Sequence, residues 1–362
     1  MDLDARLTVL GSLNMDISVT VPELPRPGAT VLGGGAAFAP GGKGANQAVA
    51  AARLGREAGL AVRMVGCVGD DDFGRALRAA LAAEGVDHQA VRTVAGAPSG
   101  IAMITIDRAG ENIITVAPGA NREVGPAEVA AIGPAGVLVI SAEVPVPAIL
   151  AALTAAGEGA APVEGAAVEG AAASARAGAV EGAAGARAGA GAGAGTPGGR
   201  RPLTVLNLAP APPEAARLVA AGPDWLVVNE SEAAAVLGRP VRGLAEAARA
   251  AAELVAAGAR QAVVTAGAAG AAFLAGPGDS RQSAGTVAAF PVTAVDTVGA
   301  GDTFVGALAV ALAAGIAPRE AVTAAAAAGA AAVTRPGTQA GMPRPADISA
   351  VTGFRWPLPA GS

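Results

Sequence analysis

Cysteine, histidine and aromatic residues are all scarce in this chain of 362 residues. The single cysteine, Cys67, cannot form an intrachain disulfide, which suits a reducing compartment, and its apolar neighbours predict a small core residue. The single histidine, His88, argues against histidine-based catalytic triads and against metal sites built from several histidines. Aromatic residues make up only 2% of the chain, so its core must be built from Val, Leu, Ile and Ala.

Excess basic charge and long apolar runs are lacking as well. The net charge of −5 argues against a basic surface for nucleic acid or an acidic membrane, so neither partner is expected. The longest apolar helix candidate, residues 303–317, is too short and too rich in glycine to span a bilayer. The acidic first six residues lead directly into a strand and predict no signal peptide. These features predict a soluble, cytoplasmic protein.

Segments that suit strands alternate with segments that suit helices along most of the chain. This alternation predicts an α/β fold, a doubly wound and mostly parallel sheet flanked by helices, with residues 1–362 as one domain. Segments 19–38 and 92–117 are rich in turn signals and are expected to form a small separate β-sheet. Strands of the main sheet are predicted at 7–10, 61–68, 137–140, 203–206, 225–228, 262–265 and 270–274.

Residues 157–201 interrupt the alternation with a low-complexity segment of alanine and glycine. The pentad V-E-G-A-A occurs there three times, which leaves a structured repeat array as an alternative, although each unit has almost nothing large to bury. We expect a disordered insertion in a surface connection, where a long loop costs little stability.

The run D-T-V-G-A-G-D at residues 296–302 directly precedes an apolar helix. Gly299, Ala300 and Gly301 leave backbone N–H groups uncovered at a helix N-terminus, a place that attracts phosphate. Asp302 in such a site suits a base that takes a proton from a hydroxyl attacking a phosphoryl group. It equally suits a simple N-cap on a glycine-rich turn, and these residues alone do not decide between the two. The chain has no G-x-x-x-x-G-K-[ST] run, so it is not a P-loop enzyme.

Polar residues follow several of the predicted strands, where ligands of doubly wound sheets bind. One set suits the many hydroxyls of a sugar: Asn14, Asp16, Lys43, Asn46 and Glu143. A second set suits a nucleotide with Mg²⁺: residues 229–232 (N-E-S-E) and the Gly/Ala loop 265–270. Each set has a plainer alternative, turns and helix capping for the first and a capping box for the second. The five groups of the first set, placed at strand ends and helix starts, shift the interpretation toward a ligand site.

Ten motifs occur in an order typical of one known family: G-S-L-N-M-D (11–16), P-G-G-K-G-A-N-Q-A (40–48), G-D-D-x-F-G (69–74), G-E-N (110–112), G-A-N (119–121), L-N-L-A-P-A (206–211), N-E-S-E (229–232), T-A-G-A-A-G (265–270), V-D-T-V-G-A-G-D-T-F (295–304) and V-T-R-P-G-T-Q (333–339). They cover nearly the whole chain outside the insertion and the last dozen residues. With them, the chain resembles the ribokinase family of PfkB-type sugar kinases, which also includes adenosine kinases and fructokinases.

The resemblance implies a ribokinase-like fold whose small sheet acts as a lid over the sugar. It implies ATP-dependent phosphorylation of D-ribose at its 5-hydroxyl, with ATP, Mg²⁺ and a monovalent cation, usually K⁺, as cofactors. Pairing of two lids implies a homodimer. A kinase for 2-deoxyribose or for another furanose or nucleoside is the alternative within enzymes, and a non-catalytic sugar-binding regulator is the alternative from another class.

The resemblance also assigns roles by motif position. Asp302 would be the general base, with the anion hole formed by Gly299, Ala300, Gly301 and Asp302. The sugar would be bound by Asn14, Met15, Asp16, Gly42, Lys43, Gly44, Ala45, Asn46, Glu143 and Asp302. ATP would contact Asn229, Thr265, Ala266, Gly267, Ala268, Ala269, Gly270, Gly301 and Asp302. The monovalent cation would be held near Asp296, Val298, Ala332, Arg335, Gly337 and Gly341.

Two positions depart from the family pattern. Gly341 stands where these kinases often place a serine near the cation, so one cation ligand is expected to be lost. Ala326 stands where a His or Asn usually lies near the adenine, so adenine binding is expected to be weaker or differently shaped.

Overall fold

Parallel strands of Val, Leu and Ile form the centre of the protein in the computed structural model, which describes residues 6–158, 201–275 and 284–358. The large sheet has the strand order β13-β12-β11-β10-β9-β8-β1-β4-β5. Its strands are β1 (Leu7–Leu10), β4 (Val62–Gly69), β5 (Val91–Val94), β8 (Val137–Ser141), β9 (Leu203–Asn207), β10 (Trp225–Asn229), β11 (Gln261–Thr265), β12 (Gly270–Ala275) and β13 (Ala284–Ala288). All neighbours from β5 to β11 pair in parallel, while β12 and β13 pair antiparallel. The predicted doubly wound, mostly parallel sheet is confirmed.

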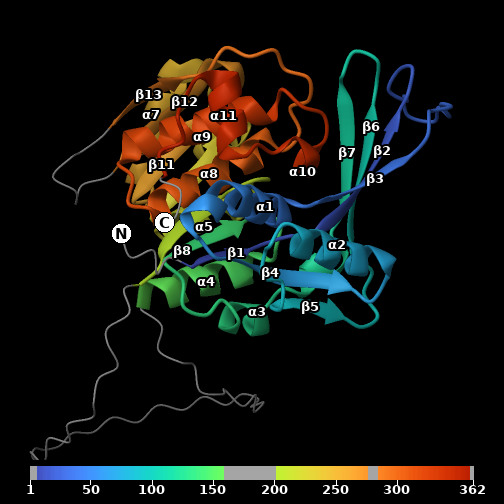
Figure 1. Ribbon diagram of the computed structural model, residues 1–362, viewed down its shortest axis with the longest axis horizontal. Coiled ribbons are helices and arrows are strands. Elements are labelled where there is room, and N and C mark those ends of the chain that lie inside the picture. Colours follow the sequence, from blue (N-terminus) through green and yellow to red (C-terminus); the bar gives the residue numbers. More distant parts are fainter. Residues whose placement is uncertain (1–5, 159–200, 276–283, 359–362) are drawn as a thin grey trace, which may run out of the picture.

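Helices cover both faces of this sheet, and each face has its own hydrophobic core (Figure 1). One core is formed with helices α1 (Lys43–Gly55), α2 (Asp72–Ala83), α8 (Ala300–Ala313), α9 (Pro318–Ala332) and α11 (Pro345–Thr352). The other is formed with α4 (Val146–Glu158), α5 (Ala215–Ala220), α6 (Glu230–Leu237) and α7 (Gly243–Ala256). The remaining short helices are η1 (Arg56–Ala58), η2 (Gly119–Glu123), α3 (Pro126–Ala130), η3 (Gly267–Ala269) and α10 (Thr338–Gly341).

Small side chains dominate the first core, as the composition predicts. Helices α8 and α9 pack against each other with fully buried alanines, among them Ala307, Ala324 and Ala328. Trp225 and Phe273 are the largest fully buried side chains, and both lie in sheet strands. Cys67 is also fully buried, and burial raises the pKa of its thiol to about 12, as suits a core residue.

A second, four-stranded sheet stands away from the large one (Figure 1). Its order is β3-β2-β6-β7, with β2 (Asn14–Thr20), β3 (Ala37–Gly41), β6 (Gly100–Ile106) and β7 (Asn112–Ala117). We expected segments 19–38 and 92–117 to supply this sheet, and the observed strands differ at both N-terminal boundaries. β2 begins at Asn14, directly after the first strand of the large sheet, and β5 belongs to the large sheet through its pairing with β4.

The Ala/Gly-rich insertion expected at 157–201 lies almost entirely outside the described residues. Within the described ranges, no helix has the length and apolar character needed to cross a bilayer.

Candidate active site

The candidate site lies at the carboxyl-terminal edge of the large sheet, where several predicted residues meet. Asn14 follows β1, and Glu143 follows β8. Asn229 and Thr265 are the last residues of the adjacent strands β10 and β11 and stand opposite each other in register. Because parallel strands end at the same edge, residues far apart in the sequence are brought to one place.

Asp302 lies in the first turn of α8 and is only 7% exposed. Its two carboxylate oxygens each accept a hydrogen bond from helix α1. The Asn46 Nδ2 donates to Oδ2 over 2.9 Å, and the Gln47 Nε2 donates to Oδ1 over 3.1 Å. The alternative of a simple N-cap is wrong, because Gly299 is the N-cap residue and the Asp302 side chain bonds to α1 instead.

The turn before α8 is built from glycine for a steric reason. Gly299 has a φ of 81°, and a Cβ atom there would lie 2.7 Å from the Cγ2 of Thr338. A Cβ on Gly301 would meet no atom within 4 Å, so the backbone at this position faces open space. The N–H of Ala300 is partly engaged by the carbonyl of Thr297 at 3.3 Å. Among the described residues, the N–H groups of Gly301 and Asp302 have no protein acceptor.

The polar groups that suit a sugar form a charged cluster near Asp302. Burial, together with the nearby charges of Glu143 and Asp302, raises the pKa of Asp16 to about 7. The same carboxylates, Asp302 above all, raise the pKa of Lys43. Gly41 makes room for this arrangement, because a Cβ at that position would overlap the Asp16 carboxylate.

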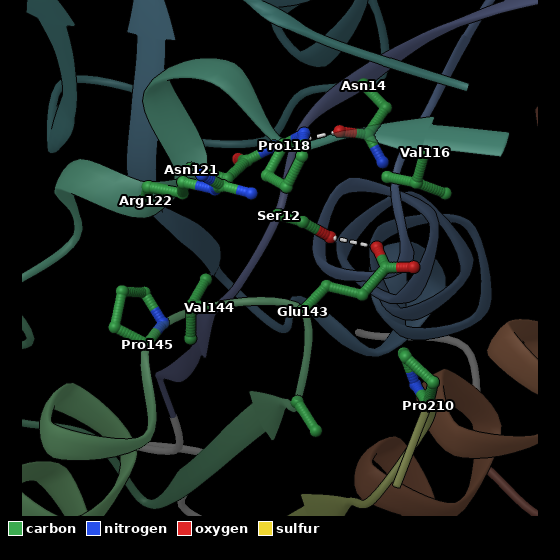
Figure 2. A pocket seen from close by; sticks show the side chains of 11 residues that line it. Ser12, Asn14, Val116, Pro118, Asn121, Arg122, Glu143, Val144, Pro145 and Pro210 are labelled. Atoms are coloured by element: carbon green, nitrogen blue, oxygen red, sulfur yellow. Dashed lines mark hydrogen bonds between the residues drawn. The ribbon is translucent and has the colours of Figure 1, made fainter. Parts of the chain in front are cut away.

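Glu143 is oriented by the segments around it. Its Oε2 accepts hydrogen bonds from the Ser12 Oγ at 2.6 Å and from the Lys43 backbone N–H at 3.3 Å. Figure 2 shows this contact with Ser12 on the wall of a cavity of about 350 Å³. The cavity is lined by Ser12, Asn14, Val116, Pro118, Asn121, Arg122, Ala142, Glu143, Val144, Pro145 and Pro210.

Asn14 is held by a residue to which no role was assigned from the sequence. The Asn121 Nδ2 donates to the Asn14 Oδ1 over 2.8 Å and to the Leu13 carbonyl over 3.0 Å. The Asn121 Oδ1 accepts from the Leu13 N–H at 2.9 Å. The oxygen of the Asn14 amide is therefore engaged within the protein, which leaves its NH₂ group for a ligand.

Two residues expected to contact the sugar have their side chains elsewhere. Met15 and Ala45 are buried in the hydrophobic core between the sheet and its helices. Gly42 and Gly44 instead allow close packing at the start of α1, since a Cβ on either would lie within 2.8 Å of backbone atoms.

The residues expected to contact ATP lie at the ends of β10 and β11. Asn229 and Glu232 form a reciprocal capping box, with distances of 2.8 and 2.9 Å, so the plainer alternative for this motif is also correct. The Asn229 NH₂ group and one Glu232 oxygen are not used by this box. The loop after Thr265 forms η3, whose three residues are exposed.

The segments expected to hold a cation are tied together by Asp296. Its Oδ1 accepts from the Val298 N–H at 2.9 Å, and its Oδ2 accepts from the Gly337 N–H at 2.8 Å. An ideal Cβ on Gly341 would lie 3.0 Å from the carbonyl oxygen of Arg335 and 3.3 Å from that of Ala332. Both carbonyl oxygens therefore lie beside Gly341, and carbonyl oxygen is the kind of donor that an alkali cation takes.

Sequence and structure comparisons show which family the chain belongs to. Residues 4–173 and 198–345 match the family described as pfkB family carbohydrate kinase. A ribokinase of Haemophilus influenzae is 33% identical over 341 residues, which cover 93% of this chain and 95% of that protein. The chain belongs to the pfkB family of carbohydrate kinases. It is a sugar kinase, an enzyme that transfers a phosphoryl group to a carbohydrate.

Solved structures show the same fold over nearly the whole chain. The ribokinase of Thermotoga maritima has a TM-score of 0.72 and 28% identity, and the match covers 96% of this chain and 98% of that one. The Arabidopsis thaliana ribokinase, solved with ribose and ATP, has a TM-score of 0.74 and 26% identity, covering 97% and 99%.

Proposed function

We propose that this enzyme phosphorylates D-ribose at its 5-hydroxyl with ATP, giving D-ribose 5-phosphate and ADP. The observation that carries the proposal is Asp302, a buried carboxylate in the first turn of α8, beside the open backbone of Gly301. The relatives and solved neighbours named ribokinase, one of them holding ribose and ATP, support ribose and ATP as substrates.

In this reaction Asp302 acts as the general base. It takes the proton of the attacking hydroxyl, whose oxygen forms a bond to the γ-phosphorus of ATP as the bond from that phosphorus to the leaving oxygen of ADP breaks. The N–H groups of Gly299, Gly301 and Asp302 serve as the anion hole for the transferring group, while that of Ala300 is partly engaged by Thr297. The positive end of the α8 dipole adds to their effect.

The sugar is bound by the polar groups at the carboxyl ends of β1 and β8. Asp16 and Glu143 accept hydrogen bonds from its hydroxyls, and the free NH₂ of Asn14 donates to them. Lys43 balances part of the negative charge that these carboxylates and Asp302 bring together. The small sheet closes over the sugar as a lid and keeps water from competing as acceptor.

Asn229 and the backbone of residues 265–270 bind ATP at the adjacent strand ends. No group of three or more His, Cys, Asp or Glu side chains in the described part of the chain is placed to hold a metal ion. Mg²⁺ would accordingly be held by the phosphates and by water, with the free oxygen of Glu232 nearby, and it supplies charge neutralisation. The cytoplasm, where ATP is available and thiols stay reduced, is the compartment that suits this chemistry.

A monovalent cation would be held by Asp296 and by carbonyls of Val298, Ala332, Arg335 and Gly337. When bound, it neutralises the carboxylate and carbonyl charge behind the anion hole. Asp296 itself holds the loop that leads to Gly299, because it bonds to both Val298 and Gly337. Gly341 offers no side-chain oxygen at this position.

We also propose that two copies pair through their small sheets. Phe38, Met103 and Ile113 lie on one face of this sheet and are 47–59% exposed. Apolar side chains gathered on a protruding sheet are typical of a subunit interface.

A second candidate substrate is a larger furanose such as a nucleoside. The cavity beside Asn14 and Glu143 has apolar walls, among them Val116, Pro118 and Val144, which suit a group attached to the sugar ring. The values of kcat/KM for ribose, 2-deoxyribose and adenosine separate these substrates.

The test of the proposed function is Asp302→Asn, assayed as ADP release with ribose in the presence and absence of K⁺. Turnover should fall by at least ~10²-fold, the usual scale for losing a general base. Asp72→Asn, an exposed carboxylate on α2, is the matched control and should retain full activity. Near-normal turnover of folded Asp302→Asn would refute the assignment of the base. If the unmodified enzyme released no ADP with ribose, with 2-deoxyribose or with adenosine, the substrate class would be refuted.

A further inference from the structure

Gln47 is a fully buried polar side chain that contacts the base directly. It lies in the second turn of α1, and its Nε2 donates to the Asp302 Oδ1 over 3.1 Å and to the Asn207 Oδ1 over 2.9 Å. Both hydrogens of this amide are thus used inside the protein. Its Oε1 is buried and has no hydrogen-bond partner among the described residues.

Asn207 fixes the direction in which the Gln47 amide points. The Asn207 Nδ2 donates to the Val227 carbonyl over 3.2 Å, so the Asn207 oxygen faces Gln47. A reversed Gln47 amide would set its oxygen against the oxygens of both Asn207 and Asp302. The NH₂ group therefore has to face the base, at the cost of leaving Oε1 unpaired.

The backbone also holds α1 close to α8 at this point. A Cβ on Gly306 of α8 would lie 2.8 Å from both the Gln47 carbonyl oxygen and the Cβ of Ala50. Only glycine permits this approach. The two helices are thereby packed at a separation that lets the Gln47 side chain reach Asp302.

The two donors to Asp302 differ in their relation to the ligand. Asn46 is one of the residues assigned to the sugar, and its Oδ1 accepts from the Gln339 Nε2 at 3.1 Å. Gln47 is buried, and its amide hydrogens bond only to protein oxygens. If the bound sugar accepts a hydrogen bond from the Asn46 amide, Oδ2 of Asp302 loses that donor, while Oδ1 stays bonded to Gln47.

We infer that Gln47 is a positioning residue for the base, with Asn207 acting through it. Gln47 holds Oδ1 of Asp302 so that Oδ2 receives the proton of the attacking hydroxyl. This inference rests on the proposed function, because it requires Asp302 to be the base.

The test is Gln47→Met, which keeps the length of the side chain and removes both donors. We expect kcat to fall about 10- to 100-fold, since a misplaced catalytic group costs this much. The KM values for ribose and ATP should stay within about twofold, because Gln47 touches neither substrate. A purely structural role would lower the amount of folded protein and the melting temperature without this separation of kcat from KM. Thr8→Val, which removes a buried polar group on the opposite face of the large sheet, is the control and should leave kcat unchanged.

Gln47→Glu is the second variant, in case Gln47→Met does not fold. It preserves shape but cannot donate to two oxygens at once, so it should also lose kcat with little change in KM. Asn207→Ala gives an independent measurement. It should lower kcat in the unmodified enzyme and have little further effect in the Gln47→Met background, because Asn207 acts through Gln47.

The outcomes separate this inference from the proposed function. If Asp302→Asn loses turnover while both Gln47 variants keep normal kcat, the role of Gln47 is refuted and the base stands. Fully additive losses from Gln47→Met and Asn207→Ala would refute the link between them. If Asp302→Asn keeps its turnover, the base assignment fails and the role of Gln47 fails with it.

Discussion

Replacing Asp16 with asparagine should stabilise the folded protein at alkaline pH while impairing its activity. Asp16 is half-buried beside two other carboxylates, Glu143 and Asp302, and its pKa is raised to about 7. Its pKa in the unfolded chain is near the ordinary value of about 3.9. A carboxyl group with a raised pKa stabilises the fold while it is protonated, and this stabilisation is lost as the pH rises through 7.

The size of the effect follows from these two pKa values. Between pH 5 and pH 8 the folded unmodified enzyme releases the Asp16 proton, whereas the unfolded chain has already lost it. This group alone should therefore lower the free energy of unfolding by about 3 kcal/mol over that interval. Asp16→Asn lacks the titration, so its advantage over the unmodified enzyme should be about 3 kcal/mol larger at pH 8 than at pH 5.

Urea unfolding of both proteins at several pH values measures this difference. Other titrating groups are common to the two proteins, so their contributions largely cancel in the comparison. A stability difference that stays constant from pH 5 to pH 8 would refute the raised pKa and the crowding of carboxylates that causes it. In the same variant, kcat/KM for ribose should fall by at least ~10-fold, because the NH₂ group of the amide donates where a carboxylate oxygen accepted a hydrogen bond from the sugar.

Two further predictions concern the glycine beside Asp16 and the small sheet. Gly41→Ala should lower kcat/KM for ribose at least ~10-fold with little change in the KM for ATP, because its Cβ displaces the Asp16 carboxylate. Gly34→Ala should have no effect, since a Cβ there would lie 3.7 Å from its nearest neighbour, the Thr20 carbonyl oxygen. Equal activity of the two variants would contradict the steric argument. Met103→Glu combined with Ile113→Glu should convert a dimer to a monomer in sedimentation experiments, whereas Ala216→Glu on the exposed side of α5 should not. A sedimentation coefficient unchanged by the double substitution would exclude this sheet as the interface.

The large sheet could be predicted because its strands are short, continuous apolar runs. The strand predicted at 137–140 is observed as β8, and its neighbours along the sheet were found in the same way. β13 was missed because Ala284–Ala288 carries a single large apolar residue. β2 was missed because its pairing with β6 joins segments about 86 residues apart, a separation that no local pattern reveals.

The site was only partly predictable for a related reason. Asp302 could be singled out because an acid among glycines at a helix start suits either a base or an N-cap, and the resemblance to sugar kinases favoured the base. Gln47, Asn121 and Asn207 lay within recognised motifs, but their roles depend on partners 107 to 255 residues away. An amide in a sequence carries no sign of what its two ends will bond to, so only the fold reveals these contacts.

The alanine packing of α8 and α9 has an entropic consequence. An alanine side chain has no rotamers to lose on folding, and alanine has the highest intrinsic helix propensity, so these helices form at a low conformational cost. Each buried methyl group contributes little hydrophobic free energy, and the core compensates by burying many of them. Helices packed through methyl groups lie close together, so a larger side chain at the fully buried Ala307 or Ala328 should push α8 and α9 apart. We therefore expect polar substitutions at the surface of these helices to be tolerated far better than larger side chains at the buried alanine positions.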